Sequence, residues 1–152
     1  MIDPKLDGIE HINIYSKGKT EIGRLLTNFA HTPFIHPEYG RFESVEGFWY
    51  WLRNGKQHEE LRSMYGFKAK EYGKQFESID CSTFQEDVKE AIRCKLRQNR
   101  KILQMLVDST LPLEHYYWYG DINNPKVYNL PQYKWIIDEI ERIRVVCQEA
   151  WK

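Results

Sequence analysis

The stretch ESVEGFWYWLRNG, residues 43–55, decides how the middle of this chain folds. Ser44 is a residue type that caps helix N-termini, and Gly55 is a type that ends helices. The residues between them, from Val45 to Arg53, are therefore predicted to form a helix. The run of large apolar residues at 48–52 cannot face one way on a helix, so at least one ring is expected to face a cavity or another surface.

The remaining chain is predicted to be mostly helical, with strands from both of its ends. Strand patterns cover 9–15 and 112–120, and a turn with a short strand covers 39–45. A loop is expected over 17–23 and irregular chain over 24–35. Helices are predicted over 57–66, 67–74 and 100–109, after a Thr83–Glu86 capping box, and after Pro131. The sequence thus predicts a mainly helical α+β single domain, residues 1–152, with a small β-sheet.

The composition is that of an ordinary globular protein whose 152 residues suit one domain. Because 22 basic residues balance 22 acidic ones, a nucleic-acid partner would need a local basic patch. Three distant cysteines, with no secretory signal and no long apolar run, predict a cytoplasmic protein without membrane contact. Neither a metal nor a cofactor is expected, since the sequence has no zinc-spaced His and Cys set, Walker loop or dinucleotide-binding glycine motif.

Glu46 is the first candidate for chemistry. In the first turn of the predicted helix its carboxylate is favoured by the helix dipole, which is the role of most acids at helix starts. Tyr50 lies four residues later on the same face, and the neighbouring rings offer an aromatic wall. Desolvation beside such a wall raises a carboxyl pKa and suits proton transfer near neutral pH. A surface carboxylate and a carboxylate held for chemistry both remain open interpretations.

Two further segments combine residue types that bind nucleotides. Alternation along 113–121 sends His115, Tyr117 and Tyr119 to one face, as a packed layer or as a stacking wall for a planar ring. A lysine cluster suits a diphosphate; its members are Lys68, Lys70 and Lys74. A basic run is either a solvated helix face or a patch that meets phosphates; its members are Lys89, Arg93, Lys95, Arg97, Arg100 and Lys101.

In their order and spacing, several segments resemble the NADAR family, also known as the YbiA-like proteins. The family's aromatic-Ser segment, its SNF element and its Ser-x-Glu helix start are matched by IYSK (14–17), LTNFAHTPF (26–34) and SVEGFWYW (44–51). A family Ala-x-x-x-Gly-Lys element is matched by AKEYGK (69–74), and an aromatic–glycine pair by WYGD (118–121). The chain departs from the family at Gly47, where the family has His, and near Tyr116, where the family has Asp.

This resemblance implies an α+β NADAR-like domain and a metal-independent hydrolase that acts as an N-glycosidase. The family's catalytic glutamate corresponds to Glu46, and Asp121 is the candidate for a second acid. Activities in the family include removal of ADP-ribose from guanine and hydrolysis of phosphorylated riboflavin-pathway intermediates. The favoured hypothesis is reversal of guanine ADP-ribosylation, in a nucleotide or in DNA or RNA. The alternatives are an N-glycosidase on small riboflavin-pathway intermediates and a non-catalytic ADP-ribose-binding module.

Cleavage of an N-glycosidic bond builds positive charge on the sugar, and a carboxylate stabilises that charge. Glu46 is therefore expected to carry the reaction, with a lesser part for Asp121. Three rings are expected to stack the leaving base: Trp49, Trp118 and Tyr119. The remaining substrate contacts are expected from Ser16, Lys17, Asn28, Lys70, Gly73, Lys74 and Asn129. A nucleic-acid strand is expected to lie on Arg93, Arg97, Arg100 and Lys101.

Overall fold

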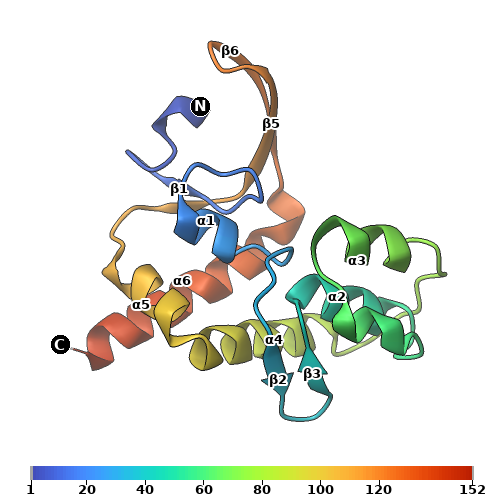
Figure 1. The fold of residues 1–152 in the computed structure, drawn as a ribbon. Coiled ribbons are helices and arrows are strands. Elements are labelled where there is room, and N and C mark those ends of the chain that lie inside the picture. Colours follow the sequence, from blue (N-terminus) through green and yellow to red (C-terminus); the bar gives the residue numbers. More distant parts are fainter. Residues whose placement is uncertain (1, 152) are drawn as a thin grey trace. The chain divides into compact units, whose positions relative to one another are not determined.

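The computed structural model describes residues 2–151, which fall into two compact units. Unit 1 combines the two ends of the chain, residues 2–27 and 101–151, and unit 2 is the continuous middle, residues 28–100. With 49% of residues in helices and 16% in strands, the protein is α+β and mainly helical, as the sequence predicts. Figure 1 labels the elements of both units. The expected single domain remains a prediction.

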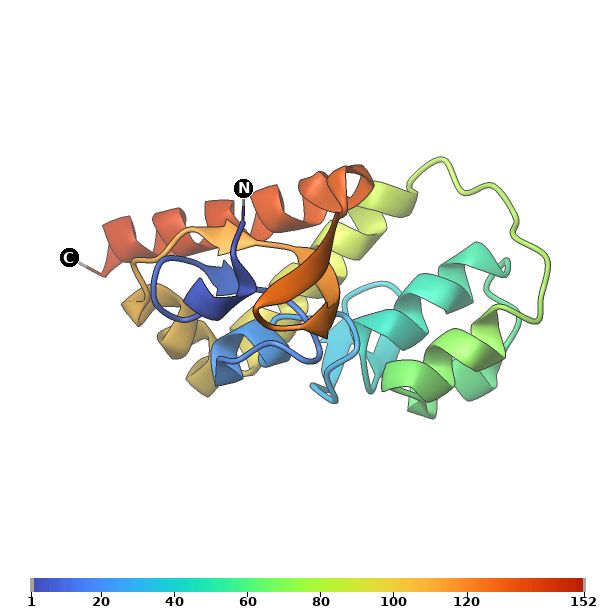
Figure 2. The same cartoon turned by 90° about the horizontal axis from the view of Figure 1, so that it is seen from above.

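Unit 2 contains a hairpin, two short helices that pack together and one longer helix. The hairpin strands β2 (Phe34–His36) and β3 (Gly40–Phe42) are antiparallel, with Phe34 opposite Phe42. The helices are α2 (Val45–Arg53), α3 (Gly66–Gly73) and α4 (Phe84–Gln98). Figure 2 shows α2 and α3 side by side. The helices predicted over 45–53 and 67–74 are confirmed, whereas 57–66 forms only a short 3-10 turn at Glu59–Ser63.

The core of unit 2 is built from aromatic rings of the opening stretch and of the hairpin. Phe48 is fully buried and packs edge-on against Phe42, with 4.9 Å between ring centroids. Trp51 and Leu52 follow three and four residues later and share this buried face. The Arg62 guanidinium covers the ring of Phe42 at 4.5 Å. The run at 48–52 therefore points in more than one direction, as predicted, because only part of it enters this core.

Unit 1 joins short strands and helices from the two ends of the chain. Its strands are β1 (Ile12–Asn13), β4 (Leu113–Glu114), β5 (Tyr116–Asp121) and β6 (Asn124–Asn129). Its helices are α1 (Glu21–Leu25), α6 (Lys134–Ala150) and α5 (Arg100–Asp108) from its second residue on. β1 pairs with β4 in parallel, and β5 with β6 in an antiparallel hairpin. The expected small sheet is thus replaced, within residues 2–151, by three two-stranded sheets.

Buried side chains tie the N-terminal segment of unit 1 to β5. The Asn13 side chain donates to the carbonyl of Tyr116 and accepts from its N–H, both at 3.0 Å. The His11 ring nitrogen Nε2 lies 2.6 Å from the Tyr116 hydroxyl. Burial raises the pKa of Tyr116 well above its ordinary value. These bonds satisfy a set of polar groups that would otherwise be costly to bury.

Two local predictions about helix starts are wrong. Residues 17–23 were expected to form a loop, but α1 begins at Glu21 because the Thr20 hydroxyl accepts from the N–H of Gly23 at 2.9 Å. The predicted capping box at Thr83 does not form, since its hydroxyl donates instead to the Asp87 carboxylate at 2.8 Å. The predicted strand at 9–15 is also shorter, with only Ile12–Asn13 in a ladder. Both helix starts are thus decided by local side-chain hydrogen bonds that the predicted pattern did not include.

Candidate active site around Glu46

Glu46 lies in the first turn of α2, where several hydrogen bonds fix the start of the helix. The Ser44 hydroxyl accepts from the N–H of Gly47 at 3.0 Å and donates to the carbonyl of Met64 at 2.8 Å. The backbone N–H of Glu46 donates to the carbonyl of Asn28 at 2.9 Å. The carboxylate therefore extends from a well-anchored helix end, which suits a group that must be positioned for chemistry.

The Glu46 side chain is buried, yet its carboxylate has no hydrogen-bond donor among residues 2–151. Glu46 is only 9% exposed. Burial disfavours the charged form and raises the pKa of Glu46 from 4.5 to about 7, while the charges of Lys70 and Lys74 act to lower it. The interpretation of Glu46 as an exposed carboxylate is therefore wrong. At neutral pH the group lies between its two protonation states, which suits proton transfer.

Two lysines of α3 are the cations that act on Glu46. Lys70 and Lys74 are four residues apart, so they share one face of the helix end. The Lys70 ammonium lies 5.9 Å from the centre of the Phe29 ring. Neither lysine forms an ion pair with an acid in the described part of the chain. Both charges are therefore available to an anionic group beside Glu46, as the sequence-based expectation of a phosphate site requires.

Gly47, which follows Glu46, has no room for a side chain. A Cβ atom at this position would lie 2.4 Å from the carbonyl oxygen of Leu61 and 3.1 Å from that of Met64. Both contacts are with backbone atoms, which do not move aside easily. The chain at 61–64 thus packs directly on the first turn of α2.

Trp49 and Gly73, both expected to contact the substrate, have clear packing roles in unit 2. The Trp49 ring lies edge-on to Phe84, with 4.7 Å between ring centroids. A Cβ atom at Gly73 would lie 2.3 Å from Cγ of Tyr50, so glycine permits the close approach of α3 to α2. Asn28 is half-buried and contributes its carbonyl to the start of α2. Their expected contacts with a substrate remain predictions.

The other predicted substrate contacts belong to unit 1. Ser16 and Lys17 are exposed in the turn that follows β1. Trp118 and Tyr119 lie in β5, and Asn129 ends β6. Asp121 is exposed at the end of β5, where its Oδ1 accepts from the N–H of Asn123 at 2.8 Å and supports the hairpin turn.

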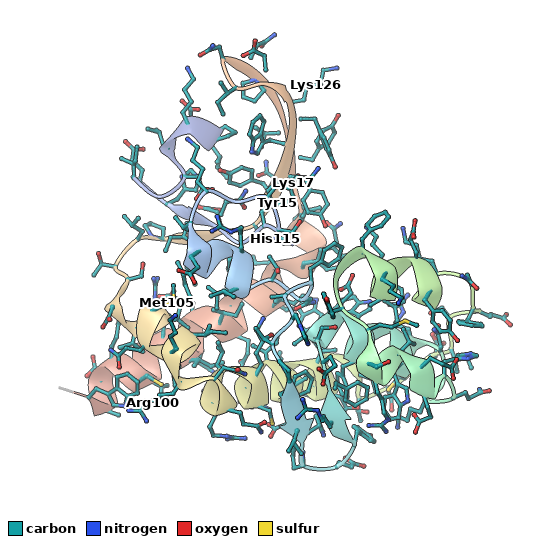
Figure 3. All side chains as sticks on the ribbon, viewed as in Figure 1. Tyr15, Lys17, Arg100, Met105, His115 and Lys126 are labelled. Atoms are coloured by element: carbon teal, nitrogen blue, oxygen red, sulfur yellow. The ribbon has the colours of Figure 1, made fainter. Side chains whose placement is uncertain are left out.

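The predicted alternation along β5 agrees with the ring contacts in unit 1. Tyr117 lies 5.3 Å from the ring of Tyr15 and 5.9 Å from that of His115. Tyr116, of opposite parity, is fully buried. The His115 ring donates from Nδ1 to the carbonyl of Ile14 at 2.6 Å, and burial lowers the pKa of His115. Figure 3 labels Tyr15, Lys17 and His115 close to one another.

The basic run at 89–101 is not a continuous solvated face. Lys95 is 2% exposed, and desolvation lowers its pKa from 10.5 to about 7. Arg93 and Arg97 both lie near the Glu90 carboxylate, at 2.6 and 3.9 Å. Arg100 and Lys101, the first two residues of α5, are exposed. Burial and the shared acid thus reduce the charge that α4 offers to phosphates.

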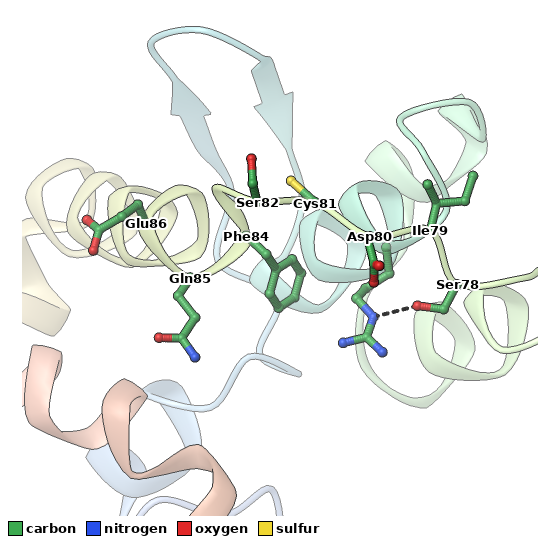
Figure 4. A pocket seen from close by; sticks show the side chains of 9 residues that line it. Ser78, Ile79, Asp80, Cys81, Ser82, Phe84, Gln85 and Glu86 are labelled. Carbon is green, nitrogen blue, oxygen red and sulfur yellow. Dashed lines mark hydrogen bonds between the residues drawn. The ribbon is translucent and has the colours of Figure 1, made fainter.

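A surface pocket of about 550 Å³ lies elsewhere in unit 2, between the end of α2 and the start of α4. Arg53 donates from Nε to the hydroxyl of Ser78 at 3.1 Å, and its guanidinium lies 5.4 Å from the Phe84 ring (Figure 4). Glu46 is not among the residues that line this pocket. Because Glu46 combines burial, a shifted pKa and two cations, we regard its surroundings, and not this pocket, as the candidate site.

Residues 2–151 contain neither a group of side chains placed to hold a metal ion nor a helix that could cross a membrane. No group of three or more His, Cys, Asp or Glu side chains is placed to hold a metal ion. In the same range, every helix is too short or too polar to cross a membrane.

Phe29 is a residue near the site to which the sequence assigned no role. Its ring lies under the Lys70 ammonium, and its carbonyl accepts from the N–H of Gly66 at the start of α3. The signal was its place directly after Asn28 in the LTNFAHTPF segment, which was noted only for its resemblance to a family element.

Comparison of the chain with protein-family models, with curated proteins and with solved structures gave no match.

The burial of Glu46 predicts a pH dependence of stability that the Glu46→Gln variant lacks. Below pH 4.5 Glu46 is protonated in both states, and its contribution to stability is fully present. Between pH 4.5 and about 7 the unfolded chain has released the proton that the folded protein still retains, so this contribution is lost as pH rises through that range. The difference between a pKa of 4.5 in the unfolded chain and about 7 in the folded protein corresponds to about 3 kcal/mol. Urea denaturation between pH 4 and 8 should show the variant gaining stability relative to the wild type.

Glu43→Gln is the matched control for this measurement. The Glu43 pKa is lowered, chiefly by its hydrogen bond with His31, so its stabilising contribution is lost as pH falls. Its variant should therefore differ from the wild type in the opposite sense. Parallel stability curves for wild type and Glu46→Gln would show that Glu46 is not desolvated.

Proposed function

We propose that the protein is an N-glycosidase that removes ADP-ribose from guanine in DNA or RNA, with Glu46 as its catalytic carboxylate. The observation that carries the proposal is the buried Glu46 carboxylate, which has a pKa near 7 and faces the charges of two lysines. Structural acids seldom persist in such surroundings, because an ionised group without hydrogen bonds is costly to bury. The NADAR-like order of sequence motifs supports the choice of the ribose–nitrogen bond.

In the proposed reaction, the bond between the sugar C1′ and the base nitrogen breaks while water attacks C1′. The electron pair of that bond leaves with the base, and positive charge develops on the sugar. The ionised Glu46 stabilises this charge and accepts a proton from the attacking water. The leaving base takes up a proton, so the products are a free sugar hydroxyl and a neutral base. This use of Glu46 requires its carboxylate form.

The anionic part of the substrate has a natural place beside this carboxylate. A diphosphate is attracted by Lys70 and Lys74, whose charges also act on Glu46. The same two cations thus serve binding and help to keep Glu46 ionised. The backbone carbonyl of Asn28 accepts from the N–H of Glu46, so we assign the contact with a sugar hydroxyl to the Asn28 side chain.

Replacement of Glu46 by Gln should lower the rate of ADP-ribose release by about 10²–10⁴-fold, because the isosteric amide neither accepts a proton nor carries charge. The assay incubates the protein with a guanine-ADP-ribosylated oligonucleotide and measures free ADP-ribose by chromatography. Glu43→Gln, three residues away, is the matched control and should retain wild-type activity.

Full activity of Glu46→Gln would remove this residue from the mechanism. Tight ADP-ribose binding by the wild type, without turnover of any glycoside, would instead favour the non-catalytic binding module.

The pH profile of kcat/KM should fall below about pH 7, since protonation removes the active carboxylate. Lys70→Met removes a charge that lowers the pKa of Glu46, so the acid limb should move to higher pH. Lys68→Met, an exposed lysine on the same helix, should leave the limb in place. Identical profiles for Lys70→Met and the wild type would show that Lys70 does not act on the essential group.

A second candidate function is hydrolysis of a small phosphorylated ribosylamine. It is favoured by one observation, the burial of Lys95 together with the placement of Arg93 and Arg97 near Glu90, which weakens the expected strand-binding patch. A small substrate does not need such a patch.

Charge reversal at Arg97 and Arg100 distinguishes the two functions. If a nucleic-acid strand lies on these residues, the double variant should raise KM for an ADP-ribosylated oligonucleotide and reduce the salt slope of binding by about two. Activity on ADP-ribosylated guanosine should be unchanged. An unchanged KM for both substrates would contradict a strand-binding role for this surface.

A further inference from the structure

The starts of α2 and α3 are held side by side by one short segment of chain. The carbonyl of Asn28 accepts from the N–H of Glu46, and the next carbonyl, that of Phe29, accepts from the N–H of Gly66. Consecutive residues are only about 3.8 Å apart between Cα atoms, so the two helix starts lie close together. The backbone of Gly66, the residue before Phe67, is thereby held near that of Glu46.

Phe67 also shares a helix face with the two lysines of the candidate site. On α3, Lys70 is three residues after Phe67, and Lys74 is seven residues after it. Residues at these spacings project from one side of a helix. A different side of α3 is buried: it carries Ala69 and also Gly73, which packs against Tyr50 of α2. An aromatic ring and two cations therefore form one stripe, and the two cations are those whose charges act on the Glu46 carboxylate.

The Phe67 ring is strongly exposed and makes no ring contact within residues 2–151. It is 61% exposed, which is a high value for a phenylalanine in a short helix. A second exposed ring lies two residues earlier, since Tyr65 is 49% exposed. Tyr65 already stacks on His31, with 4.2 Å between ring centroids and 3° between the ring planes. Phe67 is thus the ring of this group whose face is open.

We propose that Phe67 is the stacking platform for the base of the nucleotide whose phosphate is held by Lys70 and Lys74. This inference rests on the proposed function, and it adds Phe67 to the base-stacking residue already predicted in unit 2, Trp49, whose ring packs on Phe84. An exposed ring, two cations and a buried carboxylate match the three parts of a nucleotide, its base, phosphate and sugar. A nucleotide combines a planar base with an anionic phosphate, whereas lipids lack a planar ring and most peptides lack a ring beside a phosphate.

Two probes separate a contact with the base from a contact with the phosphate. Guanosine 5′-monophosphate carries both groups, whereas ribose 5-phosphate lacks the base. Stacking on an aromatic side chain strengthens binding by about 5- to 150-fold per base. Calorimetry should therefore show that Phe67→Ala weakens binding of guanosine 5′-monophosphate by a factor in this range and leaves ribose 5-phosphate unchanged. Lys70→Met should weaken binding of both probes.

The controls use conservative and matched changes. Phe67→Tyr keeps the aromatic face and should bind like the wild type, while Phe67→Leu should behave like Phe67→Ala. Tyr128→Ala removes a ring of similar exposure, 51%, from unit 1 and should change neither affinity. Because Phe67 is exposed, its loss should not unfold the protein, which circular dichroism checks.

Three results would overturn the inference: no binding of guanosine 5′-monophosphate by the wild type, equal affinity in Phe67→Ala, or an equal loss for ribose 5-phosphate. Binding is measured without turnover, so its outcome is separate from that of the glycosidase assay. Cleavage with unchanged nucleotide affinity in Phe67→Ala would refute only the platform. Base-dependent binding without cleavage of any substrate would refute only the proposed activity.

Discussion

Two neighbouring backbone carbonyls, those of Asn28 and Phe29, hold the starts of α2 and α3 and so determine what lies beside Glu46. Each accepts an N–H from the first turn of a different helix, which satisfies donors that a helix end leaves unpaired. The 3-10 turn at Glu59–Ser63 also packs on the first turn of α2, where the carbonyl of Leu61 leaves no space for a side chain at position 47. A single irregular segment thus joins the start of the helix that carries Glu46 to the start of the helix that carries Phe67 and Lys70.

The burial of Glu46 opposes the stability of unit 2, and the aromatic core supplies the compensation. A carboxylate without hydrogen bonds favours its neutral form, and keeping it ionised at neutral pH costs free energy. Phe48 and Trp51, from the same helix, are buried among the rings of the β2–β3 hairpin. One helix therefore combines a strongly stabilising face with a destabilising acid, a combination common where function limits stability.

The buried polar groups of unit 1 are hydrogen-bonded, as is typical of groups with a purely structural role. Asp7, Asn13 and Tyr116 are buried, and the carboxylate, amide and backbone groups involved are paired at 2.9–3.0 Å. Such satisfied networks fix a fold but leave no group available for reaction. Glu46 differs from these groups because it is buried without a hydrogen bond to its carboxylate, and this difference favours unit 2 as the location of the candidate site. His115 is intermediate, since one ring nitrogen is bonded and burial lowers its pKa.

The sequence by itself determined the elements that depend on neighbouring residues. The Ser44-capped helix, the helical class of 67–74 and the alternation along β5 follow from local hydrogen bonds and side-chain period, and all three are found. It also predicted Glu46 as the catalytic carboxylate and Lys70 and Lys74 as substrate contacts. Only the tertiary structure decided that Glu46 and Lys95 are buried and that the starts of α2 and α3 lie close together. Desolvation and contacts between distant segments depend on which chains pack together, and a local pattern carries no information about that.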